Sequence, residues 1–320
     1  MQRVFNDLTE LRSLCGPHDR NLDILSDMLG TKICTRGNEL ILPEATDEQQ
    51  QLFTNIVDYL QRLHKRGRII DTYVIRTLRD IMDTKPEAEV GRFVDICVQI
   101  PAGPSIYPKN ARQSEYLMKM EEHDIVFSIG PAGTGKTFLA VAKATQAILD
   151  HEKHKLILTR PVVEAGESLG FLPGDLSQKI SPYLRPLYDA LEMLMPISTI
   201  RKLEESGVIE VAPLAYMRGR NLSNCFIILD EAQNTTREQM KMFLTRMGSG
   251  SRMVITGDVT QIDLPNPQRS GLRHVTKLLH SIDEIAFSYF TSRDVIRHRL
   301  VKMIIDAYDQ ERKDELTKHR

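Results

Sequence analysis

The residues with the clearest chemical signature run from Gly130 to Thr137, in the order Gly-Pro-Ala-Gly-Thr-Gly-Lys-Thr. They fit the pattern G-x-x-x-x-G-K-[ST], in which glycines let backbone N–H groups turn toward an anion. Lys136 could then reach the β- and γ-phosphates of a nucleotide, and the Thr137 hydroxyl could bind Mg²⁺. The types and spacing of these residues therefore predict a phosphate-binding loop.

The residues on either side of this loop have the composition that such a loop requires. Residues 125–129, Ile-Val-Phe-Ser-Ile, are apolar and β-prone, as in a buried strand. Residues 138–149 carry apolar side chains at helical spacing, and the start of a helix would direct a positive dipole end at the phosphates. A chance glycine-rich turn would need neither flank, so we expect a strand, a loop and a helix in this order.

Two adjacent carboxylates form the second chemical signal. The apolar residues 225–229 predict a strand, and Asp230 and Glu231 follow it directly. Asp230 could hold Mg²⁺ through water, and Glu231 could accept a proton from an attacking water molecule. Paired carboxylates are costly unless a cation or ligand compensates them. A simple acidic start to a helix is the alternative interpretation.

A third strand also ends in polar residues. Residues 252–256 predict the strand, and Gly257, Asp258 and Gln261 follow it. Gln261 could bind the γ-phosphate or the attacking water and so report the loss of the phosphate. The alternative is an ordinary loop that begins with an aspartate.

A glutamine ahead of the phosphate loop could recognise the base. Gln113 offers both a donor and an acceptor, which fits the adenine edge. A surface glutamine at the start of a helix is equally compatible with the sequence. Because the sequence lacks the guanine signature Asn-Lys-x-Asp, we expect ATP rather than GTP. The expected nucleotide contacts are Gly130, Pro131, Ala132, Gly133, Thr134, Gly135, Lys136, Thr137 and Gln113.

Strands and helices alternate through the second part of the chain. The expected strands are residues 125–129, 155–159, 208–212, 225–229, 252–256 and 285–289. Such alternation predicts an α/β fold, a mostly parallel sheet with helices on both faces. Ligands bind at the carboxyl ends of the strands in sheets of this kind, and the three signals lie at such ends.

The first 85 residues predict a separate, small α/β domain. The expected elements are helices at 21–29, 47–63 and 73–82 and short strands at 31–35 and 40–42. Their order resembles the KH-like RNA-binding fold, whose G-x-x-G loop clamps the nucleic-acid backbone. Here the loop 16–19, expected before the first helix, has Asp19 in place of the second glycine. Because a carboxylate repels phosphate, RNA binding by this domain stays open.

Proline and glycine mark the connection between the two domains. They are frequent in residues 86–109, where we expect a linker with one strand at 93–100. The expected organisation is therefore a KH-like domain at 1–85, a linker at 86–109, a phosphate-loop domain at 110–309 and a polar tail at 310–320.

Bulk composition excludes some classes of protein. The chain has 320 residues and a formal net charge of −1, so any nucleic-acid contact must use a local basic patch. Four scattered cysteines form no metal or disulfide pattern. No apolar run approaches the roughly 20 residues of a membrane span, and the N-terminus has no signal-peptide pattern. We expect a cytoplasmic protein without membrane contact.

The three signals together resemble the RecA-like motor core of superfamily-one helicases, a P-loop NTPase fold. Longer strings are similar to the PhoH family, at residues 130–137, 160–175, 182–189, 217–220, 229–235 and 256–265. With the KH-like first domain, the chain resembles the PhoL/YbeZ branch of that family. It departs from the pattern at Asn221, where threonine is expected.

The resemblance implies a protein that binds and hydrolyses ATP with Mg²⁺. It also implies RNA remodelling or ribosome maturation, beside a YbeY-like endoribonuclease and ribosomal components, and a homo-oligomeric ring of six subunits. The expected catalytic residues are Lys136, Glu231, Gln261 and Arg297, and the expected metal ligands are Thr137 and Asp230. Arg297 is chosen from four candidate arginines, with Arg160, Arg218 and Arg220, as the cation that a neighbouring subunit supplies to the γ-phosphate.

Two other functions stay open. One is an ATP-gated scaffold for RNA or protein, whose slow hydrolysis times the release of its partner. The other is a P-loop kinase for a small molecule. Glu231 and Gln261 favour water as the phosphate acceptor over a co-substrate, and whether the protein unwinds duplexes is not decided by the sequence.

Overall fold

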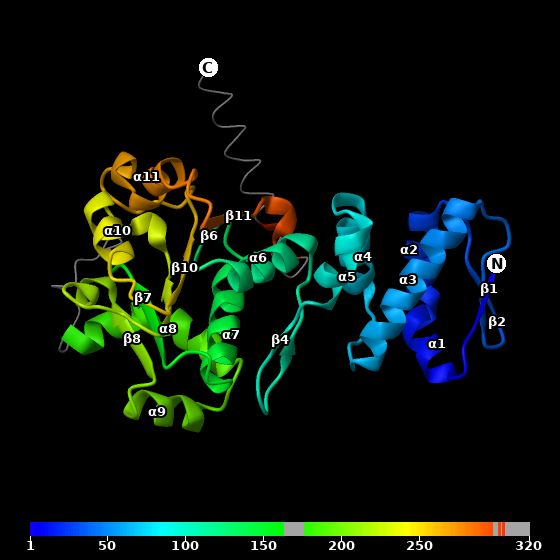
Figure 1. The fold of residues 1–320 in the computed structure, drawn as a ribbon, viewed down its shortest axis with the longest axis horizontal. Helices are drawn as coiled ribbons and strands as arrows, with labels where there is room; N and C mark the ends of the chain where they lie inside the picture. Colours follow the sequence, from blue (N-terminus) through cyan, green and yellow to red (C-terminus); the bar gives the residue numbers. More distant parts are fainter. Residues whose placement is uncertain (163–175, 297–299, 302, 305–320) are drawn as a thin grey trace, which may run out of the picture. The chain divides into compact units, whose positions relative to one another are not determined.

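The computed structural model describes residues 1–162, 176–296, 300–301 and 303–304 (Figure 1). Internal contacts divide the chain into two compact units, which we describe separately. Unit 1 comprises residues 1–99 and 104–122, and unit 2 comprises residues 100–103 and 123–320. Within the described residues, no helix combines the length and the apolar content that crossing a bilayer requires.

Unit 1 combines a small antiparallel sheet with a group of helices. The sheet has the order β1-β3-β2, from β1 (Gln2–Val4), β2 (Cys34–Arg36) and β3 (Glu39–Ile41). The helices are α1 (Leu8–Cys15), η1 (Pro17–Asp19, a 3₁₀ turn), α2 (Arg20–Leu29), α3 (Asp47–Lys65), α4 (Thr72–Thr84), α5 (Glu87–Asp95) and α6 (Ala111–Glu122). A two-stranded hairpin of β4 (Val98–Gln99) and β5 (Ser105–Ile106) lies between α5 and α6.

Local sequence signals explain the bounds of the unit 1 helices. Helix α2 ends at Gly30, whose φ of 67° is the left-handed conformation that favours glycine. Helix α3 begins at Thr46 with a capping box, in which Thr46 and Gln49 exchange hydrogen bonds between side chain and backbone. These helices and the two strands after α2 match the expected elements.

Two predictions for this part of the chain were wrong. The loop 16–19 does not precede the first helix, because α1 comes before it with Leu11, Leu14 and Cys15 buried on one face. The expected strand at 93–100 is a helix as far as Asp95, followed only by the short strand β4. Val90, Phe93 and Val94 are buried at helical spacing, which favours α5 over a strand.

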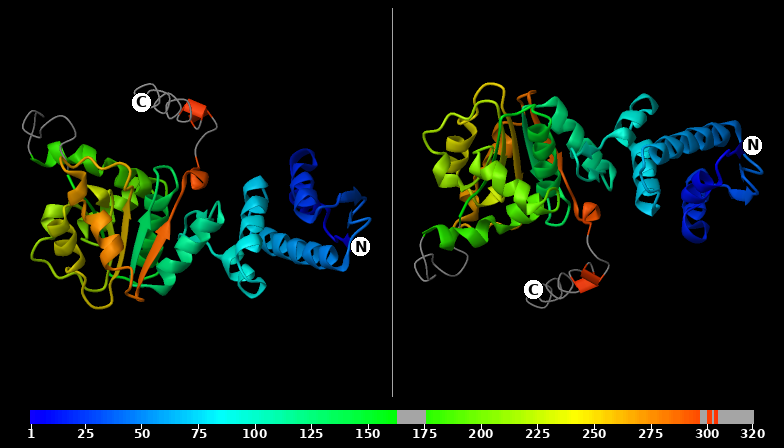
Figure 2. Two further views of the ribbon diagram at one scale, coloured as in Figure 1. Left: turned by 90° about the horizontal axis from the view of Figure 1, so that it is seen from above. Right: turned by 90° about the horizontal axis from the view of Figure 1, so that it is seen from below.

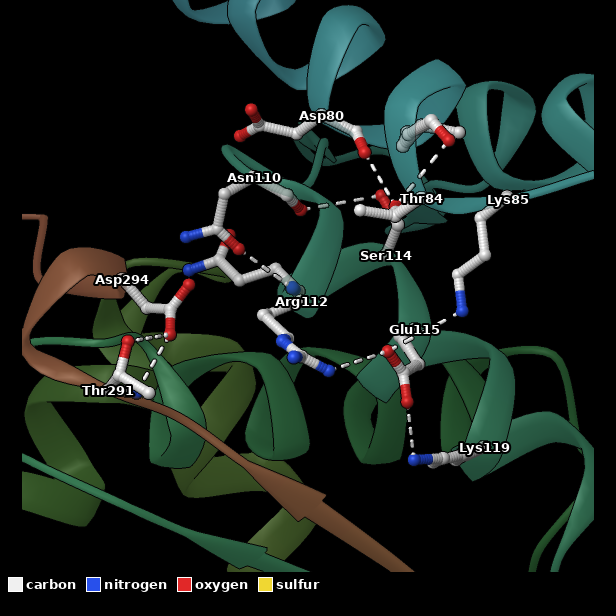
Figure 3. Close-up of polar contacts among 12 residues, drawn as sticks. Asp80, Thr84, Lys85, Asn110, Arg112, Ser114, Glu115, Lys119, Thr291 and Asp294 are labelled. Carbon is white, nitrogen blue, oxygen red and sulfur yellow. Dashed lines mark hydrogen bonds and ion pairs between the residues drawn. The ribbon is translucent and has the colours of Figure 1, made fainter.

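The bounds of unit 1 also differ from the expected domain of residues 1–85. The expected linker contains α5 and the β4–β5 hairpin, and α6 belongs to the same unit. Glu115 of α6 forms ion pairs with Lys85, Arg112 and Lys119 at 3.7, 3.2 and 2.6 Å (Figure 3). Because Lys85 directly follows α4, its ion pair with Glu115 connects α6 to the end of α4 within unit 1.

Unit 2 is built on a six-stranded sheet in which all neighbouring strands are parallel. The strands are β6 (Ile125–Ile129), β7 (Lys155–Arg160), β8 (Ile209–Pro213), β9 (Cys225–Leu229), β10 (Arg252–Gly257) and β11 (Ile285–Tyr289), in the spatial order β11-β6-β10-β9-β7-β8. The six strands lie where the sequence predicts them, with shifts of a residue at some ends. The α/β class and the parallel sheet are thereby confirmed.

Helices cover the sheet of unit 2 (Figure 2). The helices are α7 (Lys136–Leu149), α8 (Leu176–Glu192), α9 (Ile197–Glu205), α10 (Arg237–Leu244) and α11 (Gly271–Leu278), with the 3₁₀ turns η2 (Leu214–Met217), η3 (Ala232–Asn234), η4 (Pro267–Arg269) and η5 (Ser292–Asp294). Helices α10 and α11 contribute Met240, Phe243 and Leu272 to a core with alternate residues of the strands, such as Phe127 and Ile227. Strand β10 lies between β6 and β9, so the carboxyl ends that carry the three predicted signals are neighbours.

Candidate active site

The predicted phosphate loop connects the end of β6 at Ile129 with the start of α7 at Lys136. Its glycines adopt backbone conformations that other residues rarely reach, with φ of 149° at Gly130, 82° at Gly133 and 83° at Gly135. A side chain at position 130 would also collide with the chain, because its Cβ would lie 2.4 Å from the carbonyl oxygen of Phe290. The loop therefore depends on glycine for both conformation and space.

The side chain of Lys136 is folded into this loop. Its ammonium group donates to the carbonyl oxygens of Gly130 and Pro131 at 2.7 Å each and to the Thr134 hydroxyl at 3.3 Å. Burial lowers the pKa of Lys136, and the carboxylates of Asp258, Asp230 and Glu231 oppose that shift. The lysine is thus a buried cation that faces three acids.

Asp230 lies at the end of β9 between two hydroxyl groups. Thr137 of α7 donates to its Oδ1 at 2.7 Å, and Thr256 of β10 donates to the same oxygen at 2.6 Å. Mg²⁺ prefers oxygen ligands and is held by one or two carboxylates together with phosphates. The adjacent oxygens of Thr137 and Asp230, beside a phosphate loop, fit such an ion by their chemistry.

Glu231 has a strained backbone and a carboxylate with two partners. Its φ of 52° and ψ of 38° are left-handed, which costs a non-glycine residue roughly 1–2 kcal/mol. The carboxylate lies between two partners: Arg160 is 3.4 Å from Oε1, and the Gln233 amide donates a short hydrogen bond to Oε2. Both oxygens of the predicted proton acceptor are therefore engaged.

The loop after β10 is tied to the loop that carries Glu231. The side-chain oxygen of Gln233 accepts from the backbone N–H of Asp258 at 3.0 Å. Asn234 and Asp263 exchange two further hydrogen bonds of 3.0 and 2.8 Å. Gln261 donates to Asp258 Oδ2 at 3.0 Å, so its amide is part of the same hydrogen-bond network.

These side chains surround a cavity of about 260 Å³ at the carboxyl edge of the sheet. Its lining residues are Ala132, Gly133, Gly135, Lys136, Thr137, Phe138, Asp230, Glu231, Gly257, Asp258 and Gln261. The structure thus brings together the lysine, the two metal-ligand candidates, the acid and the glutamine that the sequence singled out.

The other predicted site residues lie elsewhere. Gly130, Pro131 and Thr134 are not in the described lining and instead contact Lys136. Gln113 is buried in α6 of unit 1, where its side-chain oxygen accepts from the Lys109 N–H at 2.8 Å. Its contact with adenine therefore stays a prediction.

The four candidate arginines have different surroundings. Arg297 lies outside the described residues, as do residues 163–175 of the string 160–175. Arg220 pairs with Glu210 at 2.8 Å on β8, and Arg218 is exposed. Arg160, at the end of β7, is the candidate that contacts the acids of the site.

Sequence reasoning missed two participants. Thr256 lies in a strand that the sequence predicts, with no chemical role assigned to it, and Gln233 lies in the string 229–235 that is similar to the PhoH family. The signal for Gln233 was present, because an amide two residues after a carboxylate can reach it. Nothing in the local sequence points to Thr256, since its contact with Asp230 depends on the pairing of β9 with β10.

A second and larger cavity, of about 480 Å³, lies in unit 1. It is lined by Leu8, Leu11, Arg12, Cys15, Gly16, Asp19, Thr35, Gly37 and Asn38. The loop 16–19 and the turn between β2 and β3 form part of its wall. In the described parts of both units, no group of three or more His, Cys, Asp or Glu side chains is placed to hold a metal ion by itself.

Comparison with known proteins gives the family. The family model for PhoH-like protein matches residues 105–309. A PhoH-like protein of Mycobacterium tuberculosis is 49% identical over 92% of this chain and 84% of its own length. One of Bacillus subtilis is 46% identical over 97% of this chain and 98% of its own.

Two other similarities cover a smaller share of this chain. Protein PhoH of Escherichia coli is 42% identical over 63% of this chain and 58% of its own length. Among solved structures, the Pif1 helicase of Candida albicans is similar at 16% identity and a TM-score of 0.32, over 61% of this chain and 43% of that one. Because the family model spans most of the chain and the relatives from Mycobacterium tuberculosis and Bacillus subtilis match along nearly all of it, the protein belongs to the PhoH-like family.

Proposed function

We propose that this protein binds ATP with Mg²⁺ and hydrolyses it. The observation that carries the proposal is the cavity beside the phosphate loop, which Lys136, Thr137, Asp230, Glu231 and Gln261 line together. A cation, two oxygen ligands for a metal, an acid and an amide are the groups that phosphoryl transfer to water needs. They come from three separate segments of the chain, so their meeting is not a consequence of one local motif.

Each residue has a distinct task in the proposed reaction. The loop N–H groups and Lys136 bind the β- and γ-phosphates, and Lys136 leaves its carbonyl partners to do so. Thr137 and Asp230 hold Mg²⁺, which when bound neutralises charge on the phosphate oxygens. Glu231 accepts the proton of the water that attacks the γ-phosphorus, while the bond to the β–γ bridging oxygen breaks. Gln261 orients that water, and Gln113 is proposed to contact adenine.

We further propose that hydrolysis is coupled to RNA or to a ribonucleoprotein assembly. The cavity of unit 1 supports this, because it has the apolar floor of Leu11 and Cys15 and a nearby cation, Arg12. Such a cavity suits an unstacked base of single-stranded RNA. Asp19 in its wall disfavours a phosphate there, so the base rather than the backbone is the expected contact.

The proposed setting follows from the family resemblance. It is the cytoplasm, in a ring of six copies, with a YbeY-like endoribonuclease and ribosomal components as partners. Arg297 of a neighbouring copy is the proposed cation at the γ-phosphate.

One observation favours a second candidate, an ATP-gated scaffold with slow hydrolysis. Both carboxylate oxygens of Glu231 are engaged by Arg160 and Gln233. An acid held in this way accepts a proton slowly. Such a protein would bind ATP tightly, and its slow hydrolysis would set the time at which its partner is released.

The test is the rate of phosphate release from Mg²⁺–ATP with and without single-stranded RNA, beside nucleotide affinity. We expect turnover that RNA stimulates, and a loss of about a hundredfold or more in Lys136→Ala. The matched control is Lys202→Ala, at an exposed position of α9. Slow turnover that RNA leaves unchanged would support the scaffold, and unchanged turnover in Lys136→Ala would refute the assigned site.

A further inference from the structure

Arg160 approaches the acids of the site from the strand next to them. It ends β7, which pairs with β9, and its guanidinium lies 3.4 Å from Glu231 Oε1 and 4.0 Å from Asp230 Oδ2. Both acids line the nucleotide cavity, whereas Arg160 is not in that described lining. The guanidinium therefore belongs to a residue outside the described lining and contacts two acids that are part of it.

The other partner of Glu231 is fixed. Gln233 is 1% exposed, and its side-chain oxygen accepts from the Asp258 N–H at 3.0 Å. This bond sets the orientation of the amide, so that its NH₂ group must face Glu231. Turning the amide would leave the buried N–H of Asp258 without its partner, which is unfavourable.

Arg160 is by contrast the partner that can leave. Its side chain is 21% exposed, and its two contacts with the acids are longer than the hydrogen bond from Gln233. A guanidinium that moves away from Glu231 regains water, so its departure leaves no buried donor without a partner. The two partners of Glu231 thus differ: the hydrogen bond from Gln233 is rigid, and the ion pair with Arg160 is releasable.

The charges of the described site residues explain why a second cation, Arg160, lies beside the acids. Asp230, Glu231 and Asp258 face Lys136, which is buried beside them. Lys136 alone leaves an excess of negative charge, and Arg160 supplies the second cation. A divalent cation held by Thr137 and Asp230 would neutralise this excess negative charge in place of Arg160. The attraction between Arg160 and the acids would then weaken.

We propose that Arg160 is a positioning residue that occupies Glu231 in the nucleotide-free protein and releases it when Mg²⁺–nucleotide fills the cavity. In the free protein it balances the acids and keeps the proton acceptor engaged. When it leaves, Glu231 Oε1 becomes available to water, while Gln233 continues to hold Oε2. The inference rests on the proposed function, because it concerns when Glu231, the proton acceptor of that reaction, is available.

The first arm of the test measures thermal unfolding and needs no turnover. Arg160→Ala should lower the Tm of the nucleotide-free protein by about 2–4 °C, the shift that the loss of one ion pair produces in a domain of this size. With saturating Mg²⁺ and a non-hydrolysable ATP analogue, the difference from the unsubstituted protein should disappear. Arg220→Ala is the control, because its partner Glu210 lies away from the cavity and its deficit should persist in both states.

The second arm separates kcat from KM. Without RNA, Arg160→Ala should leave kcat unchanged, because Arg160 has already left Glu231 in the ATP-bound protein. It should lower KM for ATP severalfold, because ATP binding no longer has to displace the arginine from the acids. Arg160→Lys keeps a cation with fewer donors, so its nucleotide-free Tm and its KM for ATP should lie between those of Arg160→Ala and the unsubstituted protein.

Three results would overturn the inference. A hundredfold loss of kcat in Arg160→Ala, with intact analogue binding, would place the arginine on the reacting phosphate instead. An equal Tm deficit with and without the analogue would show a structural role alone, and an unchanged Tm and KM would show no role. If the unsubstituted protein binds the analogue but never hydrolyses ATP, the proposed function fails, and the thermal arm still decides what Arg160 does.

Discussion

Thr137 Oγ1 lies 2.7 Å from Asp230 Oδ1, although 93 positions separate the two residues in the sequence. This hydrogen bond joins the first turn of α7 to the end of β9. It places two candidate oxygen ligands for a metal side by side next to the phosphate loop. The structure thereby connects the glycine-rich loop and the paired carboxylates, which the sequence presents as separate signals.

Removal of the Thr137 hydroxyl should weaken the metal dependence of nucleotide binding. Thr137→Val keeps the shape of the side chain but loses the oxygen, so we expect the Mg²⁺ concentration at half-saturation to rise about tenfold or more. Titration of Mg²⁺ at fixed ATP, followed by nucleotide binding, measures this. Thr256→Val is the control, because it removes the other hydroxyl at Asp230 Oδ1 and spares Thr137. Equal Mg²⁺ curves for both variants would contradict the assignment.

Glu231→Gln should separate binding from hydrolysis. The amide keeps the size of the side chain and can still accept from Gln233, but it cannot take a proton from water. We expect ATP affinity within a few-fold of the unsubstituted protein and a kcat lower by about 10²–10⁴. Single-turnover kinetics beside equilibrium binding test this, with Glu238→Gln on α10 as the control. Full turnover in Glu231→Gln would assign the proton acceptor elsewhere.

Gly130→Ala should destabilise unit 2. Its φ is 149°, and the added Cβ would meet the Phe290 carbonyl oxygen at 2.4 Å, so both strain and collision contribute. We expect a loss of roughly 2 kcal/mol or more in unfolding free energy. Gly207 has a φ of 71°, and a Cβ added there would meet open space. Gly207→Ala should therefore lose only the unfolding free energy that corresponds to backbone strain. Chemical denaturation compares the two, and equal losses would rule out the collision.

The ion pair of Glu210 with Arg220 should make stability depend on acid pH. The hydrogen bond from Arg220 is the main cause that lowers the pKa of Glu210 from 4.5 to about 2, with Lys155 adding to it. The folded value is below the unfolded one, so the stabilisation is complete above pH 4.5 and is lost as the pH falls toward 2. Arg220→Ala should therefore lower Tm at pH 7 and lose most of that deficit near pH 2. A deficit that stays constant across this range would exclude the linkage.

Local signals were sufficient for most elements of unit 2. Parallel strands buried on both faces are nearly continuous apolar runs, and β6 and β9 have the predicted bounds for that reason. In unit 1 the same reasoning failed at residues 93–100, where Val90 and Phe93 belong to a buried helical face. A short apolar run is compatible with both structures until its packing partners are known.

The sequence by itself determined the chemistry available to this protein: a glycine loop with Lys136 and Thr137, two acids at a strand end, and an α/β frame to carry them. Those features are local, since each depends on residue types at fixed short spacing. Only the tertiary structure decided that β10 lies between β6 and β9 and that β7 flanks β9, which brings Thr256 and Arg160 to the acids. Strand order arises from long-range packing of the whole sheet, and no short stretch of sequence encodes it.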